Sequence, residues 1–248
     1  MDRSAYQRHL EIDRSHFWRA AKRELLRDLL TDGGPPENKL RLLDIGGASS
    51  LYPSVLAEWG SVTVVEPDGE CVETAKAVLG TDIRQGSLPD DLGVEGPFDV
   101  ISMLDVLEHI EDDQRALEAV RDLLASAGRL IMTVPALPAL YSDHDRALHH
   151  FRRYTRRTLI EVIEAAGLEV KRVSYWTSLL LPLVATQRTV SKARSALNPR
   201  RSVEYTVELP SKGLNALLAG AMTVERHLLR AMPMPVGSSL FAIVERPI

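Results

Sequence analysis

Short apolar runs alternate with helical patterns through most of the chain. The runs have Leu, Ile and Val at consecutive positions, as is typical of strands buried on both faces, and they predict strands at 40–45, 61–66, 82–85, 98–104, 129–134 and 168–176. Apolar positions at a 3.6-residue period predict helices between them, near 51–59, 69–79, 112–125 and 156–166. This alternation predicts a parallel sheet that is covered by helices on both sides.

The two ends of the chain depart from this alternation. A helix is predicted at 16–30, and the Gly- and Pro-rich run at 31–36 ends it. Two helical stripes follow residue 178, and a last strand is expected at 238–246. We therefore divide the chain into a helical segment at 1–36, an α/β core at 37–177, a helical insertion at 178–237 and the last core strand at 238–248.

Composition narrows the class of protein. The chain has 248 residues, of which 45% are hydrophobic and 26% charged, as in ordinary globular proteins. The single cysteine, Cys71, excludes a disulfide framework. The longest apolar run, 179–185, is far shorter than the roughly 20 residues of a membrane-spanning helix, and the N-terminal residues have no apolar signal core. We expect a cytoplasmic protein.

Charge is unevenly distributed along the chain. Residues 178–248 carry nine basic and four acidic side chains, while the rest of the chain has a balance of −9. The acidic body argues against nucleic acid as a partner. The basic, leucine-rich insertion leaves peripheral contact with an anionic membrane open, although a helix with a solvated charged face is the preferred interpretation. Its apolar stripes predict packing against the substrate side or a second subunit, so a monomer and a homodimer both remain open; its basic side chains would stay outside.

The first strand–helix junction contains a candidate nucleoside site. Gly46 and Gly47 follow the buried strand, and Glu66 ends the second strand 22 positions after Asp44. Glycines allow a tight turn and close approach of a ligand, and a carboxylate can accept two hydrogen bonds from ribose hydroxyls. The GxGxxG and Walker spacings are absent, which argues against dinucleotides and phosphoryl transfer.

These motifs resemble those of the class I S-adenosylmethionine-dependent methyltransferases of small-molecule type. The resemblance rests on Leu43-Asp44-Ile45-Gly46, on Phe98-Asp99-Val100-Ile101 and on Asp105-Val106-Leu107-Glu108-His109, in the family's order. It implies a Rossmann-like, seven-stranded, doubly wound sheet with an N-terminal helical lid and a helical insertion before the last strand. It also implies S-adenosylmethionine as cofactor and S-adenosylhomocysteine as product, bound by Asp44, Gly46, Gly47, Glu66, Pro67, Ser87, Leu104, Asp105 and His109. Acidic side chains at this edge suit a cationic sulfonium.

Three positions depart from the family pattern. Ala48 and Ser50 replace glycines of the first motif, and Ser87 stands where an acid often binds the adenine amino group. These departures predict weaker cofactor binding or a shifted pose. They also motivate an alternative to catalysis, namely a repurposed or non-methylating S-adenosylmethionine-binding scaffold.

The long connection after the fifth strand carries the candidate chemistry. A histidine there can act as a general base because its ordinary pKa lies near neutrality. We assign catalytic roles to His150, His109 and Tyr154, and substrate contacts to Phe17, Trp18, Tyr141, His144, Arg152 and Arg153. We expect His150 nearer the reacting centre than His144, which two aspartates would hold as a solvated ion pair. No metal site is expected, because the Asp/His mixture lacks a rigid spacing.

Alternatives stand beside these assignments. Arg152 and Arg153 can form an ion-pair network with Asp143, Asp145 or Glu161 that fixes the loop. Phe17 and Trp18 can attach the first helix to the body without touching a ligand. The expected reaction is methyl transfer to a small acceptor, and the apolar insertion points to a hydrophobic molecule or a secondary metabolite.

Overall fold

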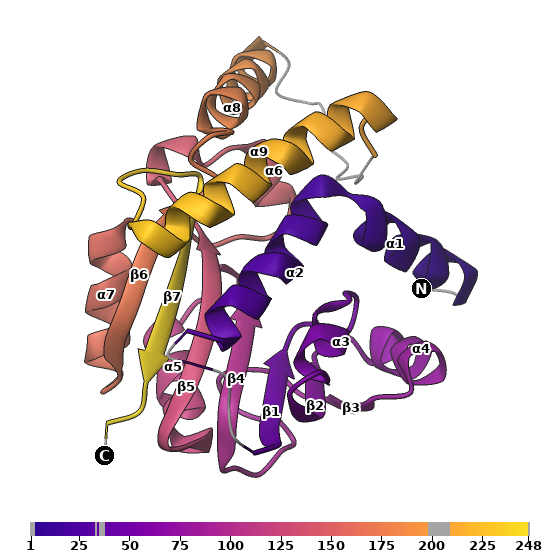
Figure 1. Cartoon of the computed structure of the whole chain (residues 1–248), viewed down its shortest axis with the longest axis vertical. Helices are drawn as coiled ribbons and strands as arrows, with labels where there is room; N and C mark the ends of the chain where they lie inside the picture. The colour runs from indigo at the N-terminus through magenta and orange to yellow at the C-terminus, as the bar shows by residue number, and fades with distance from the viewer. Residues whose placement is uncertain (1–2, 33, 35–37, 198–208, 248) are drawn as a thin grey trace.

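A computed structural model describes residues 3–32, 34, 38–197 and 209–247, with the side chains of 194–197 left out. Half of the predicted break at 31–36, namely residues 33, 35 and 36, lies outside the described residues. The chain forms one seven-stranded sheet with helices on both faces (Figure 1). The strands are β1 (Leu40–Ile45), β2 (Gly60–Glu66), β3 (Asp82–Gln85), β4 (Phe98–Leu104), β5 (Leu124–Pro135), β6 (Glu169–Trp176) and β7 (Ser239–Glu245).

The strand order is β3-β2-β1-β4-β5-β7-β6, and β7 alone runs antiparallel to its neighbours. The strands that alternate with helices therefore run parallel, as predicted, and only the last strand, whose direction the pattern did not indicate, is antiparallel. Ser239 pairs with both Trp176 and Pro135, so β7 begins at the edge where β5 and β6 end. Because the helical insertion leaves and re-enters the sheet at that same edge, the last strand has to run in the opposite direction.

Two hydrophobic layers hold the helices to the sheet. One face packs against α5 (Asp113–Leu123) and α7 (Arg156–Ala165), and the other against α2 (Phe17–Leu30), α3 (Tyr52–Leu56) and α9 (Lys212–Ala231). A smaller cluster joins α1 (Arg3–Ser15) and α4 (Gly69–Leu79) to β2 and β3. Thr155 caps α7 by accepting the Thr158 N–H, and Gly167 follows the helix with φ +75°, so α7 matches the helix predicted at 156–166.

The N-terminal segment contains one helix more than predicted. α2 matches the expected helix at 16–30, but α1 precedes it. His16 separates the two, and its Nδ1 accepts the Trp18 N–H at the start of α2. α1 was missed because it buries only Tyr6, Leu10 and Asp13, so its inward stripe is narrow and partly polar.

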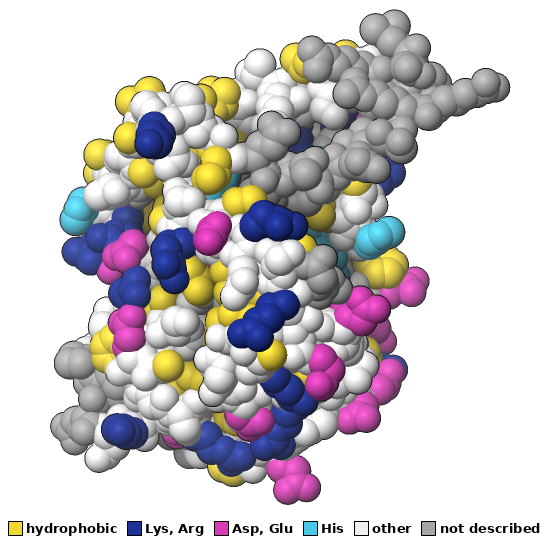
Figure 2. All heavy atoms as spheres, turned by 90° about the vertical axis from the view of Figure 1, so that its right-hand side faces the viewer, with side chains coloured by type: hydrophobic (Ala, Val, Ile, Leu, Met, Phe, Trp, Pro, Cys, Tyr) yellow, Lys and Arg dark blue, Asp and Glu magenta, His cyan; other side chains and the backbone are white. Residues whose placement is uncertain are grey.

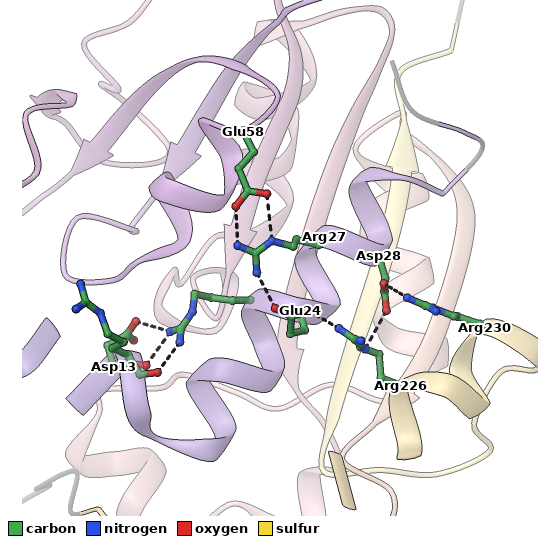
Figure 3. Close-up of polar contacts among 9 residues, drawn as sticks. Asp13, Glu24, Arg27, Asp28, Glu58, Arg226 and Arg230 are labelled. Carbon is green, nitrogen blue, oxygen red and sulfur yellow. Dashed lines mark hydrogen bonds and ion pairs between the residues drawn. The ribbon is translucent and has the colours of Figure 1, made fainter. Parts of the chain in front are cut away.

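The insertion packs on the body rather than standing free. α9 lies along α2, where Arg230 reaches Asp28 at 2.6 Å and Arg226 pairs with Glu24 and Asp28 (Figures 1 and 3). From α8 (Leu181–Leu197), Lys192 donates to the Ala139 carbonyl at 2.6 Å. Lys192 and Arg230 are exposed, as predicted, although a carbonyl and a carboxylate of the body bind them. Arg188 and Arg226 are half-buried, and the side chain of Arg194 lies outside the described part.

The apolar stripe of α9 is divided between two environments. Leu218, Met222 and Leu229 are buried against the sheet. Leu214, Leu217, Val224 and Leu228 are 40–70% exposed. Hydrophobic side chains are visible over the upper part of the face that Figure 2 draws. The expectation that both stripes of the insertion are fully covered is not met within this chain. No helix in the described ranges is long and apolar enough to cross a membrane.

The side chain of Glu225 joins α9 to the residues just before α8. Its buried carboxylate accepts the N–H groups of Ser178 and Leu179, both at 2.9 Å, just before α8 begins. Glu225→Ala is expected to lower the free energy of unfolding by about 1–3 kcal/mol, because two backbone donors lose their acceptor. Urea denaturation would measure this loss, with Thr223→Ala on the exposed side of α9 as the control. An unchanged midpoint for Glu225→Ala would contradict the prediction.

Candidate active site

The carboxyl ends of β1, β2, β4 and β5 meet at one edge of the sheet, where ligands bind in folds of this type. The loop after β1 is shaped by two glycines. Gly46 has φ +77° and donates its N–H to the Val65 carbonyl at 2.8 Å. A Cβ on Gly47 would lie 1.8 Å from Asp44 Oδ2, so no larger residue fits there without displacing that carboxyl group.

The carboxyl group of Asp44 is buried against Gly47 of this loop and does not face solvent. Its side chain is 1% exposed, Oδ1 accepts the Ser102 hydroxyl, and Oδ2 has no hydrogen-bond partner among the described residues. Burial raises its pKa to about 7; the Ser102 hydrogen bond opposes that shift and the charge of Glu66 adds to it. Burial therefore weakens the contribution of Asp44 to an acidic edge, and its role in cofactor binding stays a prediction.

Glu66 and its neighbours provide the polar part of the edge. Glu66 is half-buried at the end of β2, and burial raises its pKa, although the Asp68 N–H, 3.5 Å away, favours the charged form. Pro67 and Ser87 are exposed nearby in sequence, and the Ser87 N–H donates to the Asp91 carbonyl at 2.6 Å. The carboxylate of Glu66 and the hydroxyl of Ser87 thus remain accessible to a ligand at this edge.

Helix α1, which the sequence pattern did not predict, packs over the loop after β1 that contains Gly46 and Gly47 (the first-motif loop). The buried Tyr6 hydroxyl donates to the Ala48 carbonyl. Asp13, also buried, accepts the Leu51 N–H at 3.2 Å and pairs with Arg23 at 2.8 Å (Figure 3). The N-terminal segment therefore contacts the loop through α1, and its role as a lid stays a prediction. The spacing of Tyr6, Leu10 and Asp13 was the only sequence signal for it.

An ion pair between a buried lysine and a partly exposed aspartate joins the second N-terminal helix to the end of β4. Lys22, 2% exposed, donates to Asp105, which also accepts the Thr133 hydroxyl at 2.8 Å. Leu104 precedes it in the core, and Asp105 itself has φ +59°, a conformation that Asp tolerates. Burial alone would raise the pKa of Asp105, but the ammonium of Lys22 and the two hydrogen bonds hold it below the usual value.

Phe17 and Trp18 support attachment of the helix rather than an open pocket. The Trp18 ring lies 4.8 Å from the Trp176 ring, and the Phe17 N–H donates to Asn215 Oδ1 of α9 at 3.0 Å. Both side chains are only half-buried. These contacts match the attachment alternative, and their role as substrate contacts stays a prediction.

The loop after β5 is organised around Asp145. This residue caps α6 (Asp143–Ala147) by accepting the Ser142 N–H at 2.9 Å, and it accepts from Arg153 Nε at 2.7 Å. His150 Nδ1 lies 3.2 Å from the same carboxylate. Burial would raise the pKa of Asp145, but these partners hold it far below its usual range. Arg153 therefore belongs to the loop-fixing network that was the alternative to substrate binding.

The other predicted residues of this loop are also engaged. Tyr154 is buried and donates to Asp113 at 2.8 Å, and burial raises its pKa. Arg152 reaches the same carboxylate at 2.8 Å, and Tyr141 donates to the His150 carbonyl at 2.7 Å. Burial and the charge of Arg188 lower the pKa of His144 to about 4. His144 is therefore neutral at pH 7, and the prediction of a solvated ion pair there is wrong.

His109 and His150 meet at this edge, as their assignment to one site requires. Their rings make an edge-to-face contact with centroids 4.6 Å apart. Glu108, in the short turn η1 (Leu107–His109), lies beside them and is fully buried. Burial raises its pKa well above the usual value, and the charge of Asp105 adds to this. In the sequence, Glu108 stands out only as part of the motif Asp105-Val106-Leu107-Glu108-His109, and no role was predicted for it.

Comparison with known proteins decides the family. The profile of the family described as "Methyltransferase domain" matches residues 13–173, about two-thirds of the chain. The chain belongs to this methyltransferase family. It is a class I methyltransferase, and S-adenosylmethionine is the methyl donor of the class.

Relatives of this methyltransferase match it over part of their length. The ubiquinone biosynthesis O-methyltransferase of Caulobacter sp. is 34% identical over 108 residues, which cover 41% of this chain and 43% of the relative. The protein of the same name from Xanthomonas euvesicatoria is 26% identical over 155 residues, covering 54% and 64%. The matches thus span less than two-thirds of these relatives.

Solved structures share the fold at low identity. A chain from the complex of the Haloferax volcanii Trm112 methyltransferase activator with a methyltransferase has a TM-score of 0.61 at 17% identity, covering 99% of this chain and 95% of that one. Phosphoethanolamine N-methyltransferase 2 of Haemonchus contortus, in complex with S-adenosyl-L-methionine, has a TM-score of 0.58 at 14% identity, covering 89% and 52%. These likenesses support the fold alone.

The residues at the edge fit the cofactor. A Cβ on Gly47 would collide with Asp44, so this turn requires glycine, and Glu66 has a half-buried carboxylate at the strand end. Glu66 would accept from the ribose hydroxyls, and Gly46 and Gly47 would face the methionine portion. The bound cofactor supplies an electrophilic methyl group on sulfur.

Proposed function

We propose that this methyltransferase transfers the methyl group of S-adenosylmethionine to a hydroxyl oxygen of a small acceptor with an apolar part. The match of residues 13–173 to the methyltransferase domain carries the proposal, because this range includes the first motif, Glu66 and the His109–His150 contact. The choice of oxygen rests on the curated relatives, which are named O-methyltransferases.

The reaction is a displacement at carbon, so positioning supplies most of the catalysis. The acceptor oxygen forms a bond to the methyl carbon while the carbon–sulfur bond breaks and the sulfonium becomes a neutral thioether. The chain's own groups orient the acceptor and take up the hydroxyl proton; His109 and His150 are the candidates at the edge. The exposed leucines of α9 are consistent with an apolar acceptor.

Binding of S-adenosylhomocysteine tests the proposal before any acceptor is known. At 100 times its Kd the product should stabilise the protein by about 2.7 kcal/mol, which is seen as a rise in Tm. Methyl transfer to a panel of hydroxylated aromatic and lipid-like compounds would follow. Binding without turnover on any hydroxyl would favour the non-methylating scaffold, and absence of binding at millimolar ligand would contradict a cofactor role of any kind.

Glu66→Ala is expected to weaken S-adenosylhomocysteine binding about 10- to 100-fold, because hydrogen bonds to a charged group are worth roughly 1.5–3 kcal/mol. The fold should persist, since Glu66 lies half-buried at a sheet edge. Calorimetry measures the affinity, with Glu58→Ala, an exposed carboxylate that pairs with Arg27, as the control. Equal affinities for the two variants would contradict the assignment.

A further inference from the structure

Three potential metal ligands converge at the carboxyl edge of the sheet. Glu108, His109 and His150 each offer one ligand atom, and these atoms lie within 4.8 Å of one another. Metal–ligand distances of about 2.1 Å would place such atoms about 3.4 Å apart in a tetrahedral site, so side-chain movements of roughly 1 Å would close it. Two of the ligands come from the turn after β4 and one from the loop after β5.

The contacts within the described part of the chain do not explain why the carboxyl group of Glu108 is buried. Its side chain is 0% exposed, and neither carboxylate oxygen has a hydrogen-bond partner among the described residues. Burying a carboxyl group without a partner costs stability, and buried polar groups nearly always find one. A cation placed between this carboxylate and the two imidazoles would satisfy it.

The imidazoles already have the outer contacts of metal ligands. His150 Nδ1 lies 3.2 Å from Asp145, whose position is fixed by Arg153 and by the N-terminus of α6. This leaves Nε2 of His150 available for coordination. His109 hydrogen-bonds to the backbone of Leu148. Metal-bound histidines almost always use their second nitrogen in this way.

We propose that Glu108, His109 and His150 bind a divalent first-row transition metal ion. Two imidazoles and one carboxylate suit Zn²⁺ or Co²⁺, whereas Mg²⁺ prefers oxygen ligands alone. Asp105 is not part of the set, because Lys22 and Thr133 occupy both of its oxygens. The site revises the expectation of no metal, which considered the Asp/His loop without Glu108.

Three protein ligands would leave one coordination position open. This role rests on the proposed function: an acceptor hydroxyl bound there loses its proton to solvent more readily, and its oxygen then attacks the methyl carbon. The two imidazoles act as ligands in that case, and neither needs to serve as the base. Metal binding itself does not depend on the identity of the acceptor.

Cobalt provides a direct test on the full chain. Protein freed of metal with a chelator is titrated with Co²⁺, whose visible absorption reports tetrahedral nitrogen and oxygen ligation. We expect one equivalent to bind, Zn²⁺ to displace it, and millimolar Mg²⁺ to leave the spectrum unchanged. Titration with S-adenosylhomocysteine on the same samples keeps the proposed function separate, because cofactor binding without cobalt binding would overturn only the metal site.

Variants locate the site. Glu108→Gln and His150→Ala are expected to weaken Co²⁺ binding by at least about 10- to 100-fold. Losses of that size follow when a residue that only contacts a metal ligand is replaced, and the loss of a ligand itself should not be smaller. His227→Ala, an exposed histidine on α9, is the matched control and should bind like the wild type. Without metal, Glu108→Gln should melt no lower than the wild type, because an unpaired carboxyl group is replaced. No cobalt absorption, or equal affinity in Glu108→Gln, would overturn the proposal.

Discussion

Replacing Asp105 with asparagine should lower the free energy of unfolding by about 3–5 kcal/mol, as expected when one partner of a buried ion pair is removed. The reason is Lys22, whose side chain is 2% exposed and would keep an ammonium without its counter-charge. Asparagine is the appropriate replacement, because residue 105 has φ +59° and asparagine tolerates that backbone conformation. Urea denaturation at neutral pH measures the loss.

Replacing the other partner of the ion pair shows how much of the loss comes from an unpaired buried charge. Lys22→Met should cost less, because the Asp105 side chain is 39% exposed and water can solvate the carboxylate that remains. The double variant should recover much of the stability lost in Asp105→Asn, since no unpaired charge is left. A loss below about 1 kcal/mol in Asp105→Asn would mean that Lys22 reaches water, and that α2 does not close this edge.

The pH dependence has a defined sign. The folded pKa of Asp105 lies below its usual value, so the unfolded chain takes up a proton first on acidification. The contribution of the ion pair is therefore present above the ordinary carboxyl pKa near 4 and is lost as the pH falls through the folded value. The stability difference between the wild type and the double variant should shrink over the same range.

The sequence was sufficient for the elements whose residues face the core on both sides. β1, β4 and β5 are continuous apolar runs, and α2, α5 and α7 have wide inward stripes, so local pattern alone identifies them. The direction of β7 is not a local property, because it depends on where the insertion re-enters the sheet. α1 was missed because its contacts to the first-motif loop are polar and made by few side chains.

The site was predictable as a set of motifs but not as a set of contacts. Gly46, Gly47 and Glu66 could be placed at one edge of the sheet, because they stand at strand ends that the pattern locates. Their roles in binding stay predictions. The Lys22–Asp105 pair joins residues 83 positions apart, and no periodicity links them. Burial likewise decides the charge of Asp44 and the isolation of Glu108, and burial depends on the packed fold.

His150→Ala is expected to lower kcat by roughly 10²–10⁴-fold once an acceptor is identified, the range for a lost general base. The loop should remain folded, because Asp145 keeps its bonds to Arg153 and to the Ser142 backbone when the imidazole is removed. His227→Ala is the control, since that exposed histidine on α9 lies outside the loop and outside the His109–Glu108 cluster. A wild-type kcat for His150→Ala would leave positioning as the whole mechanism.

The same variant separates a base from a ligand. If His150 is a general base, its replacement lowers kcat and flattens the limb of the pH–rate profile that the base produces. The amount of metal bound to the protein then stays unchanged. A metal ligand holds the ion in the resting protein, so its loss lowers kcat together with the bound metal, and excess Zn²⁺ should restore part of the rate. Because Asp145 orients the imidazole of His150 in either case, Asp145→Asn should move both readouts in the same direction as His150→Ala, to a smaller extent.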